Sequence, residues 1–257
     1  MQNTIRKPFF LLALFLLQGV SGKAQDMEVG LTVGGCYYLG DLNPAKHFLN
    51  TDIAYGVVAR YNIDARWAAK ISAVHSNIKG NSSSSTFLPD NGLSFTSTLT
   101  DIEGVAEFNF MPYFTGSRVN VISPYIYSGF SVFFFNPMRD GISLRSKGTE
   151  GQTTPYSKVS FSIPFGLGVK LSLTKRLGLQ AYWEMHKTFN DYLDDVSTTY
   201  YLDSSTNPDK YSDPTLDHKP GMQRGNASNK DWYAFFGLAV TYKFNLFSSN
   251  RCRELRH

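Results

Sequence analysis

The chain has 257 residues, of which 42% are hydrophobic and 15% aromatic, and its formal net charge is +4 at neutral pH. This modest charge, without a basic stripe carrying interleaved aromatics, argues against a nucleic-acid-binding surface. Beyond the N-terminal segment, no apolar run approaches the roughly 18 residues that a membrane helix needs, which argues against a helical anchor.

The N-terminus has the pattern of a secretory signal peptide. Arg6 and Lys7 precede an apolar run at residues 9–17, and Gly22-Lys23-Ala24 places small residues at the two cleavage-defining positions. The pattern predicts a signal peptide over residues 1–24, cut after Ala24 or one residue later. If the exported chain spans a membrane it must do so as a closed barrel, because only helices and closed sheets satisfy every backbone group in lipid.

Eight later segments have strand-like patterns. They cover residues 28–38, 53–63, 67–78, 95–111, 123–134, 159–173, 177–189 and 231–244. Their lengths match or exceed the roughly 9–11 residues that a tilted membrane strand requires. The prediction is therefore a barrel over residues 25–244, followed by a tail over residues 245–257.

The segment "VSFSIPFGLGVKLSL" (159–173) shows the alternation best. Its odd positions are apolar and its even positions are small or polar, so it has one face suited to lipid or a core. Pro164 lies in its middle and cannot donate a ladder hydrogen bond. Because a barrel has no edge strand to place it on, we expect a β-bulge there. The register of the 123–134 segment is less regular, since Phe133-Phe134-Phe135 interrupts its alternation.

The connections alternate in length along the chain. Residues 64–66 and 174–176 are tight turns and 112–122 is intermediate, whereas 39–52, 79–94, 136–158 and 190–230 are long. A β-sandwich gives no reason for this alternation, but outer-membrane barrels have short periplasmic turns and long outer loops. The fold prediction is an all-β, eight-stranded antiparallel transmembrane β-barrel in the outer membrane, with both termini periplasmic.

Aromatic residues on the predicted outward faces gather near both strand ends, as expected at two lipid–water interfaces. They are Tyr61, Trp67, Phe110, Tyr242 and Phe244 on the short-turn side, and Tyr37, Tyr55, Phe161, Phe189 and Trp232 on the other side.

Eight strands enclose a lumen that side chains fill, rather than an open pore. The predicted inward set contains Arg60, Lys70, Glu103, Glu107, Lys170, Glu184, His186 and Lys243. Because buried charges are usually paired, we interpret this set as a structural ion-pair network rather than a transport or catalytic site. Arg60 and Lys70 nearly face each other and need Glu103 or Glu107 between them.

An outer-membrane barrel hydrolase, either lipid-modifying or proteolytic, remains an alternative. Ser162, His186 and Glu184 have the residue types of a nucleophile, a base and an orienting acid. Against it, no strained nucleophile turn or oxyanion donor is recognisable, so we predict no catalytic residues. Asp191, Asp194 and Asp195 lack the regular spacing of a calcium loop, and neither a metal nor a cofactor is predicted.

The two cysteines are expected at opposite ends of the barrel. Cys36 belongs to the inward face of the first strand at its outer end, and Cys252 to the tail. Their separation exceeds the ~7 Å between Cα atoms that a disulfide tolerates. Each is therefore free or pairs with another chain.

Several segments resemble one known family. "YYLGDLNP" (37–44), "GTEGQ" (148–152), "FSIPFGLGVKLSLTKRLGLQ" (161–180), "KTFNDYLDDVSTTY" (187–200), "RGN" (224–226) and "DWYAFFGLAVTYKF" (231–244) look like the PorG-like outer-membrane barrels of the type IX secretion system of Bacteroidetes. The resemblance implies a non-enzymatic component that associates with a periplasmic ring made of a lipoprotein and its partner. Protein secretion, and gliding motility in some species, depend on that machine. The family supplies no catalytic residues.

The predicted partner surface lies on the periplasmic side, where three-residue turns expose too little for a stable interface. The larger elements there are the 112–122 link with Arg118 and the tail with Arg251, Cys252, Arg253 and Arg256. Their arginines favour an acidic partner. We hypothesise that the tail docks on the ring proteins, with Cys252 available for an interchain disulfide. A stand-alone adhesion or integrity barrel, acting through its outer loops, is a further alternative.

Overall fold

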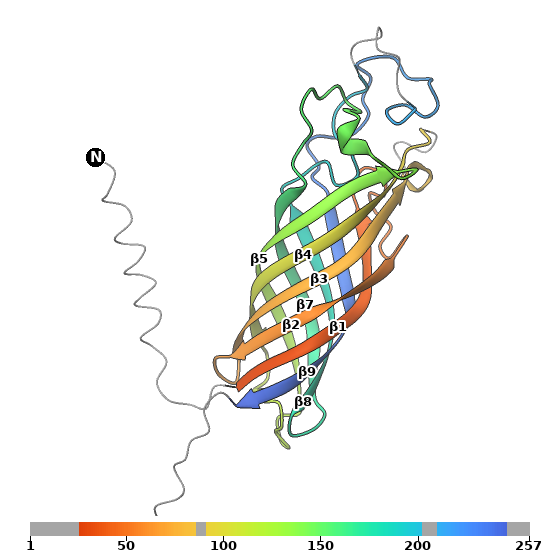
Figure 1. The fold of residues 1–257 in the computed structure, drawn as a ribbon. Coiled ribbons are helices and arrows are strands. Elements are labelled where there is room, and N and C mark those ends of the chain that lie inside the picture. The colour runs from red at the N-terminus through yellow and green to blue at the C-terminus, as the bar shows by residue number, and fades with distance from the viewer. Residues whose placement is uncertain (1–25, 86–90, 202–209, 246–257) are drawn as a thin grey trace, which may run out of the picture.

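The computed structural model describes residues 26–85, 91–201 and 210–245. Within these ranges the chain forms eight long strands, one two-residue strand and two short 3₁₀ helices (Figure 1). The long strands are β1 (Asp26–Leu39), β2 (Asp52–Asn62), β3 (Trp67–Asn81), β4 (Ser94–Asn109), β5 (Ile122–Arg139), β7 (Val159–Ser172), β8 (Leu177–Thr188) and β9 (Trp232–Asn245). The short elements are η1 (Ser82–Ser84), β6 (Ile142–Ser143) and η2 (Leu144–Ser146).

The eight long strands close into an antiparallel barrel. Their order is β4-β3-β2-β1-β9-β8-β7-β5, and a further pairing of β4 with β5 completes the ring. The first and last strands pair along their whole length, from Asp26 opposite Asn245 to Leu39 opposite Trp232. The predicted fold class is confirmed. Among the described residues, the longest helix is far too short to cross a membrane.

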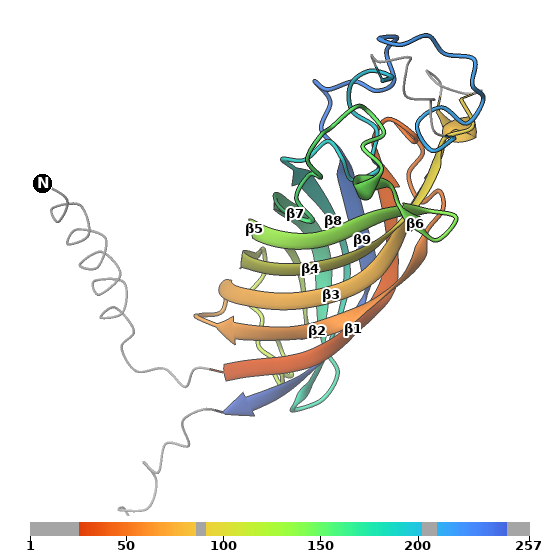
Figure 2. The same cartoon turned by 45° about the horizontal axis from the view of Figure 1, so that its top comes forward.

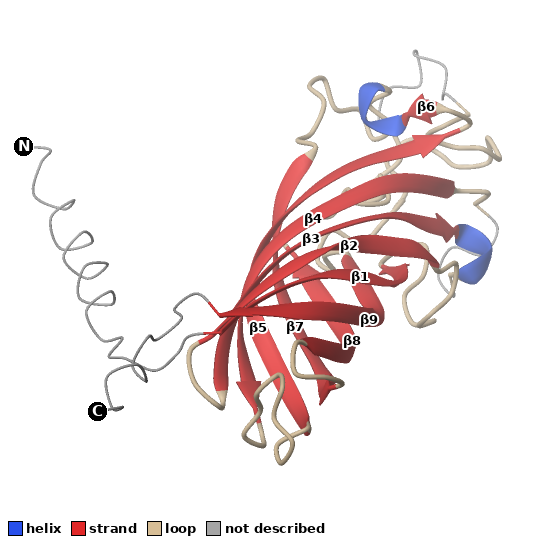
Figure 3. Cartoon of the chain, turned by 60° about the horizontal axis from the view of Figure 1, so that its bottom comes forward, coloured by secondary structure: helices blue, strands red, loops and turns tan. Residues whose placement is uncertain are grey.

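The two ends of the barrel differ, as the loop lengths predict. Residues 63–66, 110–121 and 173–176 lie at one end, here called the turn end. The described residues of the connections over 40–51, 82–93, 140–158 and 189–231 lie at the other, the loop end, where they gather over the barrel mouth (Figures 2 and 3). The predicted signal peptide and tail lie outside the described residues.

The outer surface of the barrel is apolar. Leu31, Val57, Ile71, Phe130 and Leu238 point outward and are all at least half exposed. Exposed aromatics stand near both ends of this band: Trp67, Phe110 and Phe244 at the turn end, and Tyr55, Phe161 and Phe189 at the loop end. A protein in water rarely leaves so large an apolar surface uncovered, whereas a lipid-facing barrel requires one.

Tyr37 departs from the predicted girdle. Its ring points outward, but His47 and Phe48 from the β1–β2 connection cover it, and it is fully buried. Its hydroxyl accepts a 3.0 Å hydrogen bond from the indole of Trp183. Phe48, which is 55% exposed, occupies the surface above it.

The expected bulge at Pro164 is wrong. The β5–β7 register is the same on both sides of it, with Ser128 opposite Phe165 and Ser131 opposite Ser162. Instead, the ladder is interrupted between these pairs without an extra residue. The strand tolerates the missing N–H of Pro164, and its carbonyl accepts a 2.9 Å hydrogen bond from the Ser128 hydroxyl.

Strand β5 is more regular than its sequence suggests. Phe133 and Phe135 point into the barrel and are buried, whereas Phe134 points outward and is partly exposed. The phenylalanine triplet therefore keeps the alternation, and its inward members belong to an apolar core in the loop-end half. That core also contains Cys36, Tyr38, Ile78, Leu99, Leu193, Tyr233 and Phe235. The turn-end half of the lumen is filled mainly by charged and polar side chains.

Candidate functional site

Four charged residues form the turn-side lumen cluster: Glu28, Arg60, Glu107 and Lys170. Arg60 Nε lies 2.6 Å from Glu107 Oε2, and Arg60 Nη1 lies 2.9 Å from Glu28 Oε2. Lys170 Nζ donates to the same Glu107 oxygen at 2.6 Å. All four are essentially inaccessible to solvent, and two carboxylates face two cations. This part of the lumen is fully charge-compensated.

The β4–β5 link closes the lumen beneath this cluster. Thr115 is buried and donates a 2.7 Å hydrogen bond to Glu28, while the backbone N–H of Gly116 donates to the Ser172 hydroxyl at 2.8 Å. Tyr113 is also buried, and its backbone N–H donates to the carbonyl of Ala65 at 2.9 Å. The link is thus held at three points, and its tip faces away from the barrel.

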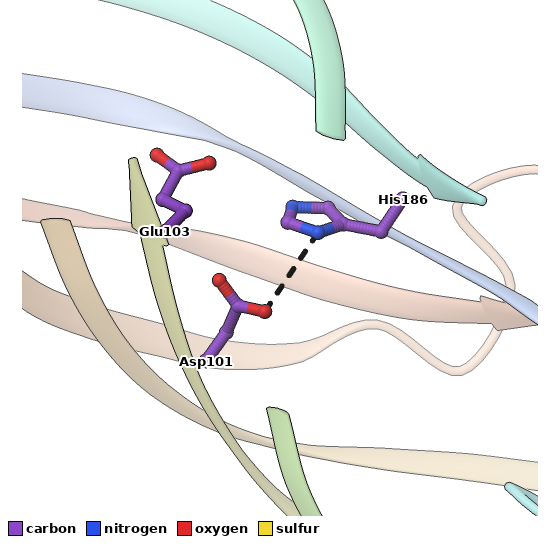
Figure 4. Close-up of side chains that lie close together, drawn as sticks. All are labelled: Asp101, Glu103 and His186. Atoms are coloured by element: carbon purple, nitrogen blue, oxygen red, sulfur yellow. Dashed lines mark ion pairs between the residues drawn. The ribbon is translucent and has the colours of Figure 1, made fainter. Parts of the chain in front are cut away.

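Five charged or titratable residues form the loop-side lumen cluster: Lys70, Asp101, Glu103, Glu184 and His186. Lys70 Nζ lies 2.8 Å from Glu103 Oε1 and 3.7 Å from Glu184 Oε2. His186 Nε2 lies 2.6 Å from Glu184 Oε1, and its Nδ1 faces Asp101 Oδ2 at 3.8 Å (Figure 4). Three carboxylates therefore surround a single ammonium group and one imidazole.

Ser162, His186 and Glu184 come together as the residue types of a hydrolase would require. Ser162 Oγ is 3.1 Å from His186 Nδ1, but it also lies 2.5 Å from Ser131 Oγ and 3.2 Å from the Tyr233 hydroxyl. Ser162 and His186 have no exposed surface, and the apolar core lies on their loop side. The arrangement is a buried hydrogen-bond network.

The loop-end connections form a compact structure over the barrel, here called the cap. Arg224 is buried and pairs with Glu150 at 3.0 Å, and it also donates to the backbone carbonyl of Asp195. The Tyr38 hydroxyl donates to Asp194 and, at 3.1 Å, to Asp231. The buried side chains of Arg224 and Tyr38 therefore connect segments of the cap that are far apart in the sequence.

Glycines permit the close approaches inside the cap. A Cβ on Gly225 would lie 2.6 Å from Asp41 Oδ2 and 2.7 Å from the Ser197 nitrogen. A Cβ on Gly40 would lie 2.1 Å from the Tyr38 hydroxyl oxygen. Packing therefore explains the glycines of "YYLGDLNP" and "RGN". Neighbouring backbone, carboxylate and hydroxyl atoms occupy the space that a side chain would need.

The cap contains more buried acid than base. Burial raises the pKa of Asp194 and Asp231 well above its ordinary value, and it raises the pKa of Asp41 to about 6. Asp191 and Asp195 also have raised pKa values because they are buried. The three aspartates of "DYLDD" each accept a hydrogen bond within the cap. Asp191 accepts from Ser197, Asp194 from Tyr38, and Asp195 from Thr149.

The turn end presents a basic surface. Among the described residues of its three connections, Arg66, Arg118, Lys175 and Arg176 are exposed, against the single acid Asp64. Beside Arg118, Val119 is 86% exposed, and Phe114 is partly exposed. Lys243, predicted to face the lumen, lies at this end and pairs with Asp26 at 3.3 Å. Arg251, Cys252 and Arg253 lie outside the described residues.

Sequence reasoning missed several residues that these sites use. Glu28 and Asp101 both follow the inward alternation of their strands, so the period of two could have identified them. Gln180, which accepts from Arg60, carries no charge to attract attention. Glu150 and Arg224 lie in loops without periodicity, and no local signal indicates their pairing.

A family model described as "Domain of unknown function (DUF6089)" matches residues 7–252. The chain belongs to this family. No curated protein matches the sequence.

Solved structures that are similar to this chain include the following three. Ail of Yersinia pestis in complex with the heparin analogue sucrose octasulfate gives a TM-score of 0.45 at 11% identity, covering 86% of this chain and 100% of that one. Neisserial surface protein A gives 0.44 at 12% identity, covering 86% and 98%. The outer membrane protein OprG of Pseudomonas aeruginosa gives 0.43 at 14% identity, covering 87% and 98%.

The closed ladder, the apolar outer band and the polar filled lumen together identify this DUF6089 member as an outer-membrane β-barrel. Buried side chains fill the lumen at its turn-side cluster. The two ends of the barrel are its surfaces outside the apolar band.

Proposed function

We propose that this protein is a non-enzymatic barrel subunit of the type IX secretion system, and that it holds the periplasmic ring of that machine at the outer membrane. In this proposal the turn end and both termini face the periplasm, and the cap faces outward. The motifs shared with PorG-like barrels support the assignment to this machine.

The observation that carries the proposal is the anchored β4–β5 link. Hydrogen bonds from Thr115 and Gly116 fix its base inside the lumen mouth, so the exposed tip with Arg118 is held in one place without a partner. An interface element that is ordered beforehand loses less conformational entropy on binding. An exposed cation beside Phe114 and Val119 suits a partner surface with acidic and apolar groups.

The sealed lumen supports a scaffold over the alternatives. A channel needs an open path, and the turn-side cluster fills the path with paired side chains. A hydrolase needs an accessible nucleophile, and Ser162 Oγ is enclosed between two strands, His186 and Tyr233. A barrel whose interior is closed acts through its ends, which is what a ring-holding subunit requires.

The test compares the same charge reversal at opposite ends of the barrel. Arg118→Glu should reduce co-purification of the ring lipoprotein and its partner from gently solubilised outer membrane, and should reduce secretion. The matched control is Lys158→Glu, which changes an exposed lysine at the loop end and should leave both unchanged. Equal recovery of ring proteins with both variants would contradict the proposed surface.

The tail is tested separately. Truncation after Leu246 should leave a folded barrel but reduce recovery of ring proteins, and non-reducing gels should show a heavier band that Cys252→Ser removes. Normal ring association after truncation would contradict docking by the tail, and absence of the band would remove only the disulfide.

The orientation has its own test. Protease added to intact cells should cut within residues 190–230 and spare residues 174–176. Cleavage at the turn but not in the loop would invert the orientation.

A further inference from the structure

Both lumen clusters combine carboxylates with basic side chains, but they differ in charge balance. In the turn-side cluster, two carboxylates meet two cations, and every ionised group has a partner within 3 Å. In the loop-side cluster, three carboxylates meet Lys70 and an imidazole. Even with His186 protonated, this cluster holds excess negative charge. Uncompensated buried charge is costly, so the cluster is made neutral by a bound proton or by a further cation.

Two carboxylate oxygens of the loop-side cluster lack hydrogen-bond partners. Glu103 Oε2 and Glu184 Oε2 are buried and unbonded, although Lys70 lies 3.7 Å from the Glu184 oxygen. Both residues also line a cavity of about 20 Å³ on the Lys70 side of the cluster, which Asp101 and His186 do not reach. The unbonded Glu103 oxygen, which belongs to the same group as Asp101 and His186, is evidence for a ligand independent of the charge count.

The donor atoms already lie close together. One ligand atom each from Asp101, Glu103 and His186 can be chosen so that all three lie within 4.8 Å of one another. Figure 4 shows the side chains converging from β4 and β8. One imidazole with two carboxylates is a donor set that suits Zn²⁺ or a similar first-row divalent ion.

We propose that Asp101, Glu103 and His186 bind a divalent transition-metal ion, such as Zn²⁺, inside the loop-side lumen. The ion sits between Asp101 Oδ2 and Nδ1 of a neutral His186, with Glu103 Oε2 as the third ligand. Its two charges, added to that of Lys70, balance the three carboxylates. The loop-side cluster then becomes neutral, as the turn-side cluster is. The site does not depend on the proposed secretion role.

The surrounding contacts are those of a second shell. The remaining imidazole nitrogen, Nε2, donates to Glu184 Oε1 at 2.6 Å, which fixes Nδ1 as the free ligand atom. The Tyr233 hydroxyl donates to Asp101 Oδ2 at 2.6 Å and orients that carboxylate. On binding, the three ligand atoms close to about 3.3 Å from one another, as tetrahedral zinc requires, and Ser162 turns its hydroxyl from Nδ1 toward Ser131.

The experiment measures metal in the untagged, full-length barrel. The protein is unfolded in urea with EDTA, refolded into detergent with either Zn²⁺ or EDTA, and passed through gel filtration before elemental analysis. The wild type should retain about one Zn²⁺ per chain. Its heat-modifiable gel transition should occur at a higher temperature than that of the EDTA-refolded protein, because a ligand that binds only the folded state stabilises it.

Variants test the ligands. His186→Gln and Asp101→Asn should each lose the ion, and Tyr233→Phe, which removes a second-shell donor, should bind about tenfold more weakly. The control Asp52→Asn removes an acid that pairs with Lys79 at the barrel mouth and should retain the ion. A wild type that refolds without stoichiometric zinc overturns the site. Zinc retained undiminished by folded His186→Gln or Asp101→Asn overturns the assigned ligands.

Discussion

Buried charges are paired differently in the turn half and in the loop half of this barrel. In the turn half, Arg60 and Lys170 are matched by Glu28 and Glu107. In the loop half, acids outnumber bases both in the loop-side lumen cluster and in the cap, where the buried base is Arg224. The turn-side cluster has equal numbers of acids and bases, whereas the loop half needs bound protons or added cations to become neutral.

This contrast between the two halves shows that the sign of a buried charge does not by itself determine whether the residue is fully paired. Glu103 and Glu107 are four residues apart on the same strand face, yet Glu107 accepts from Arg60 and Lys170 while Glu103 keeps an oxygen without a partner. The same substitution at these two positions should therefore have unequal effects.

Glu107→Gln should have the largest effect. It leaves Arg60 and Lys170 facing each other with Glu28 as the only remaining carboxylate of the cluster. Removing one partner of a buried ion pair costs about 3–5 kcal/mol of folding free energy. The measurement is the temperature at which heat-modifiable gel mobility is lost. An unchanged transition would show that the turn-side cluster does not hold the barrel.

Gly225→Ala should weaken the cap without opening the barrel. The added methyl group meets Asp41 Oδ2 and the Ser197 nitrogen at under 3 Å, and such overpacking costs about 1–3 kcal/mol. Limited proteolysis should cut the loop between β8 and β9 faster in the variant. The heat-modifiable transition should stay near that of the wild type, since a parallel fall would mean that cap and barrel unfold together.

Glu103→Gln should cost less than Glu107→Gln, even though both remove one buried carboxylate charge. Lys70 still faces Glu184, and the loss of one negative charge relieves repulsion among the remaining acids. In EDTA the free energy of unfolding should fall by less than about 1.5 kcal/mol, the contribution of an ordinary hydrogen bond. A loss equal to that of Glu107→Gln would erase the contrast between the two clusters.

The cap should loosen as the pH rises. The pKa of Asp41 is about 6 in the folded chain, above its ordinary value of 3.8, because the group is partly buried. The folded state therefore binds more protons between about pH 4 and pH 6, and stability falls as the pH rises through that window. Asp194 and Asp231, whose pKa values are raised too, extend the fall in the same direction.

Protease resistance of residues 190–201 and 210–230 at pH 5 and pH 8 measures this effect. Resistance should be greater at pH 5, and Asp41→Asn should reduce the difference between the two conditions. Greater resistance at pH 8 would reverse the sign and contradict the role of burial.

Much of the barrel could be predicted from sequence because its physics is local. The period of two assigns Arg60, Lys70 and Lys170 to the lumen without any knowledge of partners. The alternating connection lengths then predict closure and the difference between the two ends. The bulge expected at Pro164 is wrong because a strand can accommodate a missing N–H in two ways, by a bulge or by an interrupted ladder. The sequence does not distinguish between them.

The rest depends on contacts between distant segments. Glu150 and Arg224 meet across 74 positions, and neither lies in a periodic segment. The cover over Tyr37 likewise comes from a loop whose conformation, with Phe48 at a φ of 61°, has no clear sequence signal. The local conformational preferences of loop residues are weak, and tertiary contacts between distant segments decide the conformation of such loops.

Glu28 also has a consequence for the order in which the barrel is made. Its carboxylate accepts hydrogen bonds from Asn62 on β2, Thr115 on the β4–β5 link and Thr241 on β9. Strands β1 and β9 are the two ends of the chain's ladder, so these contacts are complete only after the seam between them has joined. Interactions that form only after the folding transition state slow unfolding and leave the folding rate nearly unchanged. We expect the Glu28 contacts to act in this way, so that Glu28→Gln speeds the reopening of the seam. On this expectation, a single acid near the start of the barrel adds to the kinetic stability of the closed structure.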